Sequence, residues 1–345
     1  MNKSSQCITL GDGRKVGSGE PVFIIAEIGN NHQGNFDLAI EAIKQASECC
    51  ADAVSFQYAP IETYCIKSLH DKPELSYLKE CEFTLSQLSQ LRECAKSLGL
   101  SFSINVEDSD TLDKVVEIGI DFIKLCSADL TNIPYIQHSC TRGLPIFFST
   151  GAAYLEEIQI AFEAMTSAGL KDYVIYHTNS AYPTPISEAN ILQMNTLAKE
   201  IGGLIGYCDH TVEILPPVVA VSRGASVIEK HITTSRDLKG DDWMVSLEPG
   251  EFKQMVSLIR QTELALGTSE KLPLPSEEET RSFKRKSIVS KIKISKGSTI
   301  NKEDLNFKAP GTGISPAELD KVIGKKAKVD IEEDILIDLN FLEES

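Results

Sequence analysis

Eight short apolar segments recur along the first two thirds of the chain, and their spacing is the strongest constraint on its fold. Each is rich in β-branched and aromatic residues and most are followed by an amphipathic stretch, a pattern typical of βα units around a parallel sheet. The segments are VFIIAE (22–27), AVSFQY (53–58), LSFSIN (100–105), DFIKL (121–125), PIFFST (145–150), YVIYH (173–177), LIGY (204–207) and SVIEKH (226–231). Eight units of this size predict an α/β fold, a closed (β/α)8 barrel. An open doubly wound sheet is the alternative, but no GxGxxG motif follows the first segment.

Turn signals divide the chain further. Gly11–Asp12–Gly13 stands between two short β-like runs and predicts a hairpin that would plug the bottom of the barrel. After Leu266 the sequence turns polar and contains prolines, which predicts a linker; short alternating runs separated by Gly and Pro follow it. We therefore expect the barrel with its hairpin at residues 1–275, a linker at 276–286 and a small β-rich domain at 287–345.

The net charge excludes two classes of partner. The chain has 34 basic and 50 acidic side chains, a net charge of −16. Binding to nucleic acid or to an anionic membrane requires the opposite sign. Residues 1–275 hold 21 basic and 36 acidic side chains, whereas residues 281–328 hold 13 basic and 4 acidic ones. An anionic substrate would therefore need a locally positive site.

The sequence gives no signal for export or membrane insertion. The N-terminal stretch MNKSSQCITLGDGRK lacks the apolar core of a signal peptide, and no run reaches the roughly 18 apolar residues that span a bilayer. The nine cysteines form no CxxC pair, so a zinc ribbon or dithiol redox chemistry is not indicated. We expect a cytoplasmic protein.

Two histidines stand where a parallel barrel carries its chemistry, at the C-terminal ends of strands. His210 and His231 end the seventh and eighth strands, with Asp209 beside one and Asp242 on the following loop. Two imidazoles there suit a divalent cation that keeps open positions for substrate oxygens. Nitrogen and oxygen ligands favour Mn²⁺, with Mg²⁺ or Co²⁺ as alternatives. The competing interpretation is a pair of structural histidines satisfied by hydrogen bonds.

A second polar group, Lys124, Ser127 and Ser149, falls at the ends of the fourth and fifth strands. One fixed charge and two hydroxyl groups suit a phosphate or a carboxylate. The alternative is a barrel-interior lysine paired with Glu27 or Asp129. The two interpretations are compatible, because a phosphate can displace a resting ion pair.

Eight motifs also carry a resemblance to a known family. They are AEIGNNHQG (26–34), FQYAPIETY (56–64), IKLCSADLTN (123–132), FFSTGA (147–152), HTNSAYPTP (177–185), IGYCDHT (205–211), IEKHIT (228–233) and KAPGTGI (308–314). In order and spacing they resemble the motifs of the N-acetylneuraminate (sialic acid) synthase family. The resemblance extends from Val22 to the C-terminus.

The resemblance implies both a fold and a reaction. Members of the family join a (β/α)8 synthase domain to a C-terminal antifreeze-like (SAF) domain, usually in a domain-swapped homodimer. They condense phosphoenolpyruvate with an N-acetylated amino-sugar aldehyde, using a divalent metal. The products are a nine-carbon 2-keto acid and inorganic phosphate.

The family's site residues match strand ends of this chain. The metal ligands match His210 and His231. The carboxylates expected to handle protons and water match Glu27 and Asp129, the latter where the family usually has a glutamate. The substrate-binding positions match Gln57, Lys124, Ser127, Ser149, Ser180, Tyr182 and Asp242.

Four departures from the family pattern stand at the anion and sugar sites. Ser55 replaces a lysine, Ile104–Glu107 replaces a Ser-Thr-Pro-Phe-like run, and Cys208 replaces a serine. Ala309 replaces the arginine that reaches the partner subunit's sugar. Each lost charge-assisted contact costs about 1.5–3 kcal/mol in a desolvated site. We expect Lys308 to compensate part of the missing charge.

Three functions follow from the matches and departures. The first is a nonulosonic acid synthase of the sialic, legionaminic or pseudaminic kind. The second is a divergent synthase that acts on a different sugar aldehyde, such as one without the N-acetyl group. The third is a non-catalytic homologue that binds a sugar or a partner synthase, and the retained histidine pair argues against it.

Overall fold

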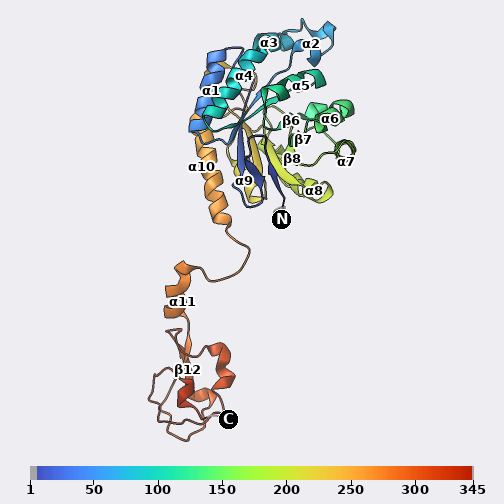
Figure 1. Ribbon diagram of the computed structural model, residues 1–345. Coiled ribbons are helices and arrows are strands. Elements are labelled where there is room, and N and C mark those ends of the chain that lie inside the picture. The colour runs from blue at the N-terminus through green and yellow to red at the C-terminus, as the bar shows by residue number, and fades with distance from the viewer. Residues whose placement is uncertain (1–5, 344–345) are drawn as a thin grey trace. The chain divides into compact units, whose positions relative to one another are not determined.

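The computed structural model describes residues 6–343, and the chain divides into two compact units, Met1–Gly267 and Thr268–Ser345. Figure 1 shows strands surrounded by helices in the first unit and a smaller body in the second. Residues 1–5 belong to the stretch inspected for a signal peptide, and residues 344–345 end the expected C-terminal domain. Both lie outside the described residues.

Eight parallel strands form the centre of the first unit, in the spatial order β5-β4-β3-β10-β9-β8-β7-β6. Their bounds are β3 Phe23–Gly29, β4 Ala53–Gln57, β5 Ser101–Asn105, β6 Ile123–Leu125, β7 Ile146–Ser149, β8 Tyr173–Thr178, β9 Leu204–Asp209 and β10 Val227–His231. Where β5 meets β6, the Asp121 N–H donates to the Phe102 carbonyl (2.8 Å). The Ser103 hydroxyl donates to the Phe122 carbonyl (2.9 Å). These bonds nearly close the sheet, so the predicted barrel is confirmed and the open doubly wound sheet is excluded.

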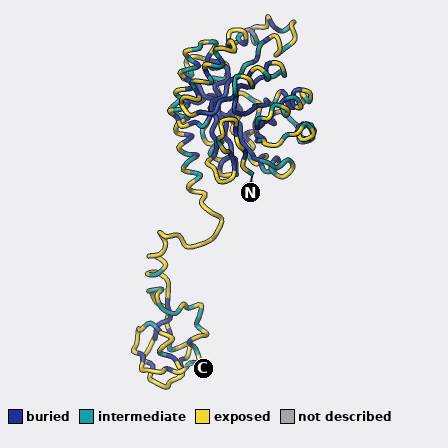
Figure 2. Tube along the Cα trace, in the orientation of Figure 1, coloured by how far each residue is buried: buried dark blue, intermediate teal, exposed yellow. Residues whose placement is uncertain are grey.

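Helices cover the outside of the barrel. They are α1 Phe36–Glu48, α4 Leu85–Ser97, α5 Ser109–Ile118, α6 Ile133–Cys140, α7 Leu155–Ser167, α8 Gln193–Glu200, α9 Leu215–Ser222 and α10 Pro249–Leu266; the short α2 Ile61–Tyr64 and α3 Pro73–Cys81 follow β4. In α1, Ala39, Ala42, Ile43 and Ala46 are buried at helical spacing. Figure 2 shows the buried residues concentrated along the strands and on the inner faces of the helices.

The predicted hairpin closes the N-terminal end of the barrel. Strands β1 Cys7–Thr9 and β2 Lys15–Gly17 pair antiparallel. Ile8, Leu10 and Val16 are buried in one apolar cluster with residues at or next to the beginnings of the barrel strands. Those residues are Phe23, Ala53, Phe122, Phe147, Val174, Leu204 and Val227. Because this end is filled with side chains, any cavity for a substrate has to open at the other end.

The second unit holds α11 Glu278–Lys284 and the antiparallel strands β11 Ser287–Ser290 and β12 Leu305–Lys308. Helix α11 lies inside the range expected to be a linker. The core of the unit is apolar and consists of Ile288, Ile294, Ile300, Leu305, Val322, Ala327, Ile331, Ile337 and Leu342. Lys308 forms an exposed ion pair with Asp334.

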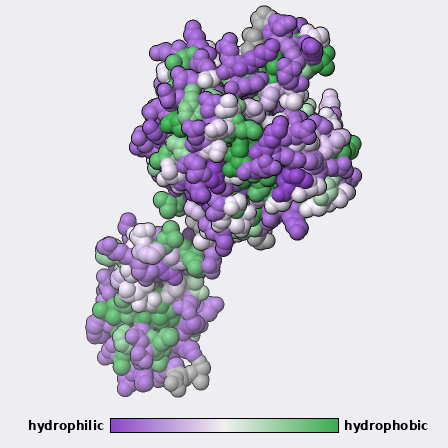
Figure 3. Space-filling view, turned by 45° about the horizontal axis from the view of Figure 1, so that its top comes forward, coloured by the Kyte–Doolittle hydropathy of each residue, from purple (hydrophilic) through white to green (hydrophobic). Residues whose placement is uncertain are grey.

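The visible surface of the first unit is mainly polar. Figure 3 shows hydrophilic side chains over most of it, with smaller areas of apolar side chains between them. Across residues 6–343, none of the helices has the length and apolar character needed to cross a membrane.

Candidate active site at the barrel mouth

A cavity of about 550 Å³ opens at the C-terminal ends of the strands, and every strand of the barrel contributes to its lining. Ten of the predicted site residues line it: Glu27, Gln57, Lys124, Ser127, Ser149, Ser180, Tyr182, His210, His231 and Asp242. Asp129 does not, although Ala128 and Leu130 on either side of it do. All three belong to a 3₁₀ turn, Ser127–Thr131, that follows β6. The expectation that site residues gather at the C-terminal ends of the strands therefore holds for all the predicted residues except Asp129.

The two histidines lie side by side as predicted, with ring centroids 5.3 Å apart. Nδ1 of His210 is 2.6 Å from the Asn179 carbonyl oxygen. Because a carbonyl only accepts, the proton sits on Nδ1 and Nε2 keeps its lone pair. The Tyr182 ring stacks on His210 at 4.0 Å between centroids. Burial lowers the pKa of His210 to about 4 and that of His231 well below its ordinary value. Both rings are therefore neutral, the form that binds metals.

Carboxylates stand next to the histidine pair. Nδ1 of His231 is buried without a hydrogen-bond partner among the described residues, 3.4 Å from Oδ2 of Asp242. A Cβ at Gly29 would stand 3.5 Å from that Oδ2 and 3.6 Å from Oε1 of Glu27, so these groups surround the glycine. A purely structural histidine would have its buried nitrogen satisfied. The unpartnered nitrogen therefore argues for a ligand-binding role.

The donor set fits a cation that takes part of its coordination from bound molecules. Among the side chains that the structure describes, no three His, Cys, Asp or Glu side chains converge closely enough to hold a metal ion by themselves. The site instead offers two neutral imidazoles beside carboxylate oxygens. Catalytic metal sites keep positions open in this way for substrate.

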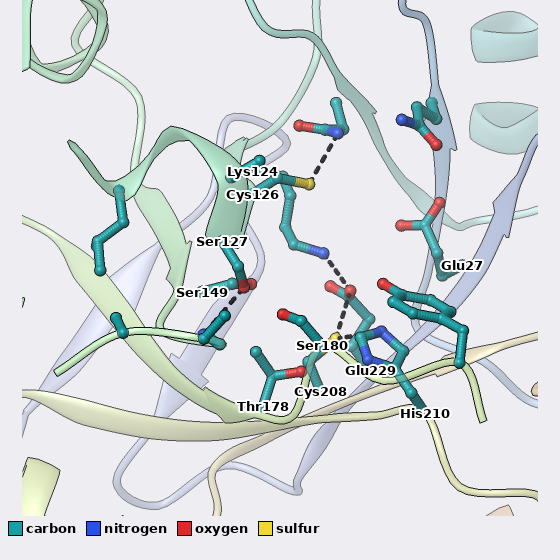
Figure 4. Close-up of a pocket in the computed structure, with 18 of the residues that line it drawn as sticks. Glu27, Lys124, Cys126, Ser127, Ser149, Thr178, Ser180, Cys208, His210 and Glu229 are labelled. Atoms are coloured by element: carbon teal, nitrogen blue, oxygen red, sulfur yellow. Dashed lines mark hydrogen bonds and ion pairs between the residues drawn. The ribbon is translucent and has the colours of Figure 1, made fainter. Parts of the chain in front are cut away.

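Lys124 is buried at the floor of the cavity and forms an ion pair with Glu229 of β10 (Figure 4). The interpretation that paired it with Glu27 or Asp129 is therefore wrong. Burial by itself would lower the pKa of Lys124, but Glu229, together with Cys208, Cys126 and Glu27, holds the pKa well above its ordinary value. Glu229 was not among the residues predicted from the sequence to form the site. The alternation of side chains along a strand could have identified it, because Glu229 and His231 are two positions apart in β10 and therefore face the same side.

Serine hydroxyls meet at Gly151 in the same cavity. The Gly151 N–H donates to Oγ of Ser127 (3.0 Å). A Cβ at Gly151 would stand 2.2 Å from Oγ of Ser180 and 2.8 Å from Oγ of Ser127. Ser149 ends β7 close to Ser127, as Figure 4 shows. Hydroxyl and N–H donors beside a lysine form a suitable cradle for an anion.

Four carboxyl groups in and beside the cavity have pKa values raised toward neutrality, and for Asp242 burial raises the pKa to about 7. Burial raises the pKa of Glu27 to about 7, with Lys124 opposing the rise. Burial, with Asp129 nearby, raises the pKa of Glu107 to about 7, and burial raises that of Asp129 to about 6. Gln57 hydrogen bonds to the Glu107 carboxyl. Groups with such pKa values can exchange protons during a reaction.

Comparison with known proteins agrees with this architecture. The model of the NeuB family matches residues 42–271, and that of the SAF domain matches residues 285–343. The N,N'-diacetyllegionaminic acid synthase of Legionella pneumophila is 37% identical, over 93% of this chain and 96% of that protein. The N-acetylneuraminate-9-phosphate synthase of Mus musculus is 33% identical, over 95% and 94%.

A solved structure extends the likeness to three dimensions. The crystal structure of the N-acetylneuraminic acid (sialic acid) synthetase from Leptospira borgpetersenii serovar Hardjo-bovis, in complex with citrate, has a TM-score of 0.75. It is 33% identical and covers 81% of this chain and 96% of its own. The chain therefore belongs to the NeuB family, the sialic acid synthase family that its motifs resemble, and it ends in a SAF domain.

Proposed function

We propose that this chain condenses phosphoenolpyruvate with an amino-sugar aldehyde, forms a nonulosonic acid and releases phosphate. The observation that carries the proposal is the meeting, in one cavity, of two neutral imidazoles, a buried lysine and serine hydroxyls. The names of the relatives, synthases of legionaminic and neuraminic acids, support a product of this class. The domain-swapped homodimer and the cytoplasmic location stay predictions of the sequence.

Lys124 and the serines are proposed to hold phosphoenolpyruvate. The lysine charge and the hydroxyls at Gly151 would bind the phosphate, once the anion competes with Glu229 for Lys124. Gln57, Tyr182 and Asp242 would hold the sugar. His210 and His231 would ligate a divalent cation, which when bound supplies Lewis-acid polarisation of the aldehyde.

With both substrates bound in this way, the reaction needs few further side chains. C3 of phosphoenolpyruvate attacks the aldehyde carbon, water adds at C2, and phosphate leaves from C2 to give the 2-keto acid. Glu27 lines the cavity beside the histidines and is proposed to take the proton from the water, because its pKa lies near neutrality. Asp129 would assist from the turn behind the lining.

Phosphate release tests the proposal. The protein, with Mn²⁺ and phosphoenolpyruvate, is incubated with a panel of acetylated and free amino-sugar aldehydes. We expect phosphate with at least one acceptor, and none with His210→Ala, which removes the Nε2 lone pair. His138→Ala, on α6 outside the cavity, is the matched control and should be active. Release no greater than that of His210→Ala with every acceptor would contradict the proposal.

The substitution Gly151→Ala tests the anion cradle and leaves the proposed metal ligands unchanged. Its Cβ would meet the Ser127 and Ser180 hydroxyls, so we expect kcat/KM for phosphoenolpyruvate to fall about 10- to 100-fold, the equivalent of one charge-assisted contact. The fall should lie mainly in KM. Gly250→Ala, whose Cβ meets no atom within 4 Å, is the control. If the two variants had the same kcat/KM for phosphoenolpyruvate, the proposed anion-binding role of this cradle would be contradicted.

The position of Glu107 supports a second candidate function, in which the acceptor sugar carries a free amino group. Its carboxyl lines the cavity and hydrogen bonds with Gln57, a proposed sugar-binding residue. An ammonium group would pair with this carboxylate, whereas an acetamide would not. The same acceptor panel decides between the two, since each free amine is matched by its acetylated form.

A further inference from the structure

Cys208 places a thiol beside the proposed metal ligands, and the reaction described above gives it no task. Its side chain is 4% exposed and lines the cavity. Sγ lies 3.6 Å from Nε2 of His210 and 3.2 Å from Oε1 of Glu229. Figure 4 shows the sulfur between these two groups. The thiol is therefore part of a cluster of possible ligands rather than an isolated buried cysteine.

The distance to His210 matches that between two ligands on one metal ion. A zinc-like ion binds thiolate sulfur at about 2.3 Å and imidazole nitrogen at about 2.0–2.1 Å, and a tetrahedral angle then separates the two donor atoms by about 3.6 Å. The tautomer agrees as well. Nδ1 of His210 is engaged by the Asn179 carbonyl, so the nitrogen that keeps its lone pair is the one next to the sulfur.

A second, independent observation comes from the neighbouring His231, whose Nδ1 lies 3.4 Å from Oδ2 of Asp242. His231 is 6% exposed, and its Nδ1 has no hydrogen-bond partner within the described part of the chain. Its ring lies 5.3 Å from that of His210 between centroids. Buried polar atoms in folded proteins are nearly always partnered, so an atom without a partner marks a position for a bound group.

We propose that Cys208 ligates the cation together with Nε2 of His210, and that this thiolate gives the site a preference for Co²⁺, Zn²⁺ or Fe²⁺ over Mn²⁺. Thiolates select softer first-row ions, whereas Mn²⁺ favours oxygen ligands. On binding, the thiol loses its proton to solvent as the sulfur–metal bond forms. The inference rests on the proposed metal site, but not on the identity of either substrate, and it replaces the Mn²⁺ preference that nitrogen and oxygen ligands alone predict.

Titration of the full-length protein with Co²⁺ tests this ligand. Ligand-field bands in the visible report bound Co²⁺, and an intense sulfur-to-cobalt charge-transfer band in the near ultraviolet reports a thiolate ligand. We expect both in the wild type at one Co²⁺ per chain. Cys208→Ser should lose the charge-transfer band, keep the visible bands and bind Co²⁺ at least about tenfold more weakly, because even outer-shell changes cost 10- to 100-fold. Its affinity for Mn²⁺ should change less.

Cys126→Ser is the matched control, because Cys126 also lines the cavity but its sulfur accepts a hydrogen bond from Asn105. It should keep the charge-transfer band. Visible bands without a charge-transfer band in the wild type would overturn the inference and leave the metal site and the proposed function intact. A band that survives Cys208→Ser would also overturn it, and absence of Co²⁺ binding would overturn the ligand and the metal site together. Phosphate release with Mn²⁺ is read separately.

Discussion

Replacing Lys230 with methionine is expected to lower the free energy of unfolding of the first unit by about 3–5 kcal/mol, the cost of leaving a buried charge unpaired. Lys230 and Asp209 form an ion pair of 2.6 Å in which both side chains are 0% exposed. Lys230 also donates to the Thr211 carbonyl. Trp243, the single tryptophan, lies in the first unit, so denaturant unfolding followed by its fluorescence reports on that unit.

Two comparisons separate the buried pair from an ordinary ion pair. Lys199→Met breaks an exposed pair with Glu200 and should change the unfolding free energy by less than about 1 kcal/mol. Adding Asp209→Asn to Lys230→Met should recover most of the loss, because no uncompensated carboxylate is then left. A loss as small as that of Lys199→Met, or a double variant no more stable than the single, would contradict this account.

The buried pair also bears on the site. Asp209 ends β9 and directly precedes His210, and Lys230 directly precedes His231 at the end of β10. The pair therefore ties together the two strand ends that present the imidazoles. The Asp209 carboxylate is fixed in turn by the Tyr207 hydroxyl (2.8 Å) and the Thr211 hydroxyl (3.0 Å). Stability and the spacing of the histidines thus depend on the same contacts.

The barrel was predictable because its strands are buried on both faces. Runs such as 22–27 read as apolar β segments, and β3 occupies Phe23–Gly29. Helix α11 was not predicted, because Glu278–Lys284 is charged and has no buried residue that would impose helical periodicity. Such a helix is stabilised by its own backbone hydrogen bonds and not by an apolar face. The amino-acid composition of the segment therefore resembles that of a linker.

Site prediction succeeded where a side chain's position follows from strand geometry. His210, His231 and Lys124 lie at strand ends, and parallel strands bring their ends together. Glu229 was missed because it sits two residues inside β10, where an acid is unexpected until its partner across the barrel is known. Asp129 lies off the cavity lining because the 3₁₀ turn after β6 sets its direction, and strand periodicity says nothing about such a turn.

Under the proposed function, Lys124→Met is expected to lower kcat/KM for phosphoenolpyruvate by about two to three orders of magnitude. Among the described residues that line the cavity, Lys124 is the one lysine or arginine, whereas the lining carboxyl groups are Glu27, Glu107, Glu157, Glu229 and Asp242. Loss of a charge-assisted contact costs about 1.5–3 kcal/mol, and the unpaired Glu229 would then repel the anion. Each 1.36 kcal/mol is a factor of about ten in rate. Steady-state phosphate release measures the change.

A double variant tells whether Lys124 contacts the substrate or only neutralises Glu229. If neutralisation were its whole role, Lys124→Met with Glu229→Gln would restore kcat/KM, because no buried negative charge would be left. If Lys124 binds the anion, the double variant should regain stability but keep the deficit in kcat/KM of about 10- to 100-fold that the lost contact alone accounts for. We expect the second result, since the serine hydroxyls at Gly151 carry no positive charge to replace it. Glu229→Gln alone should then bind phosphoenolpyruvate at least as tightly as the wild type, because the lysine no longer has a competing partner.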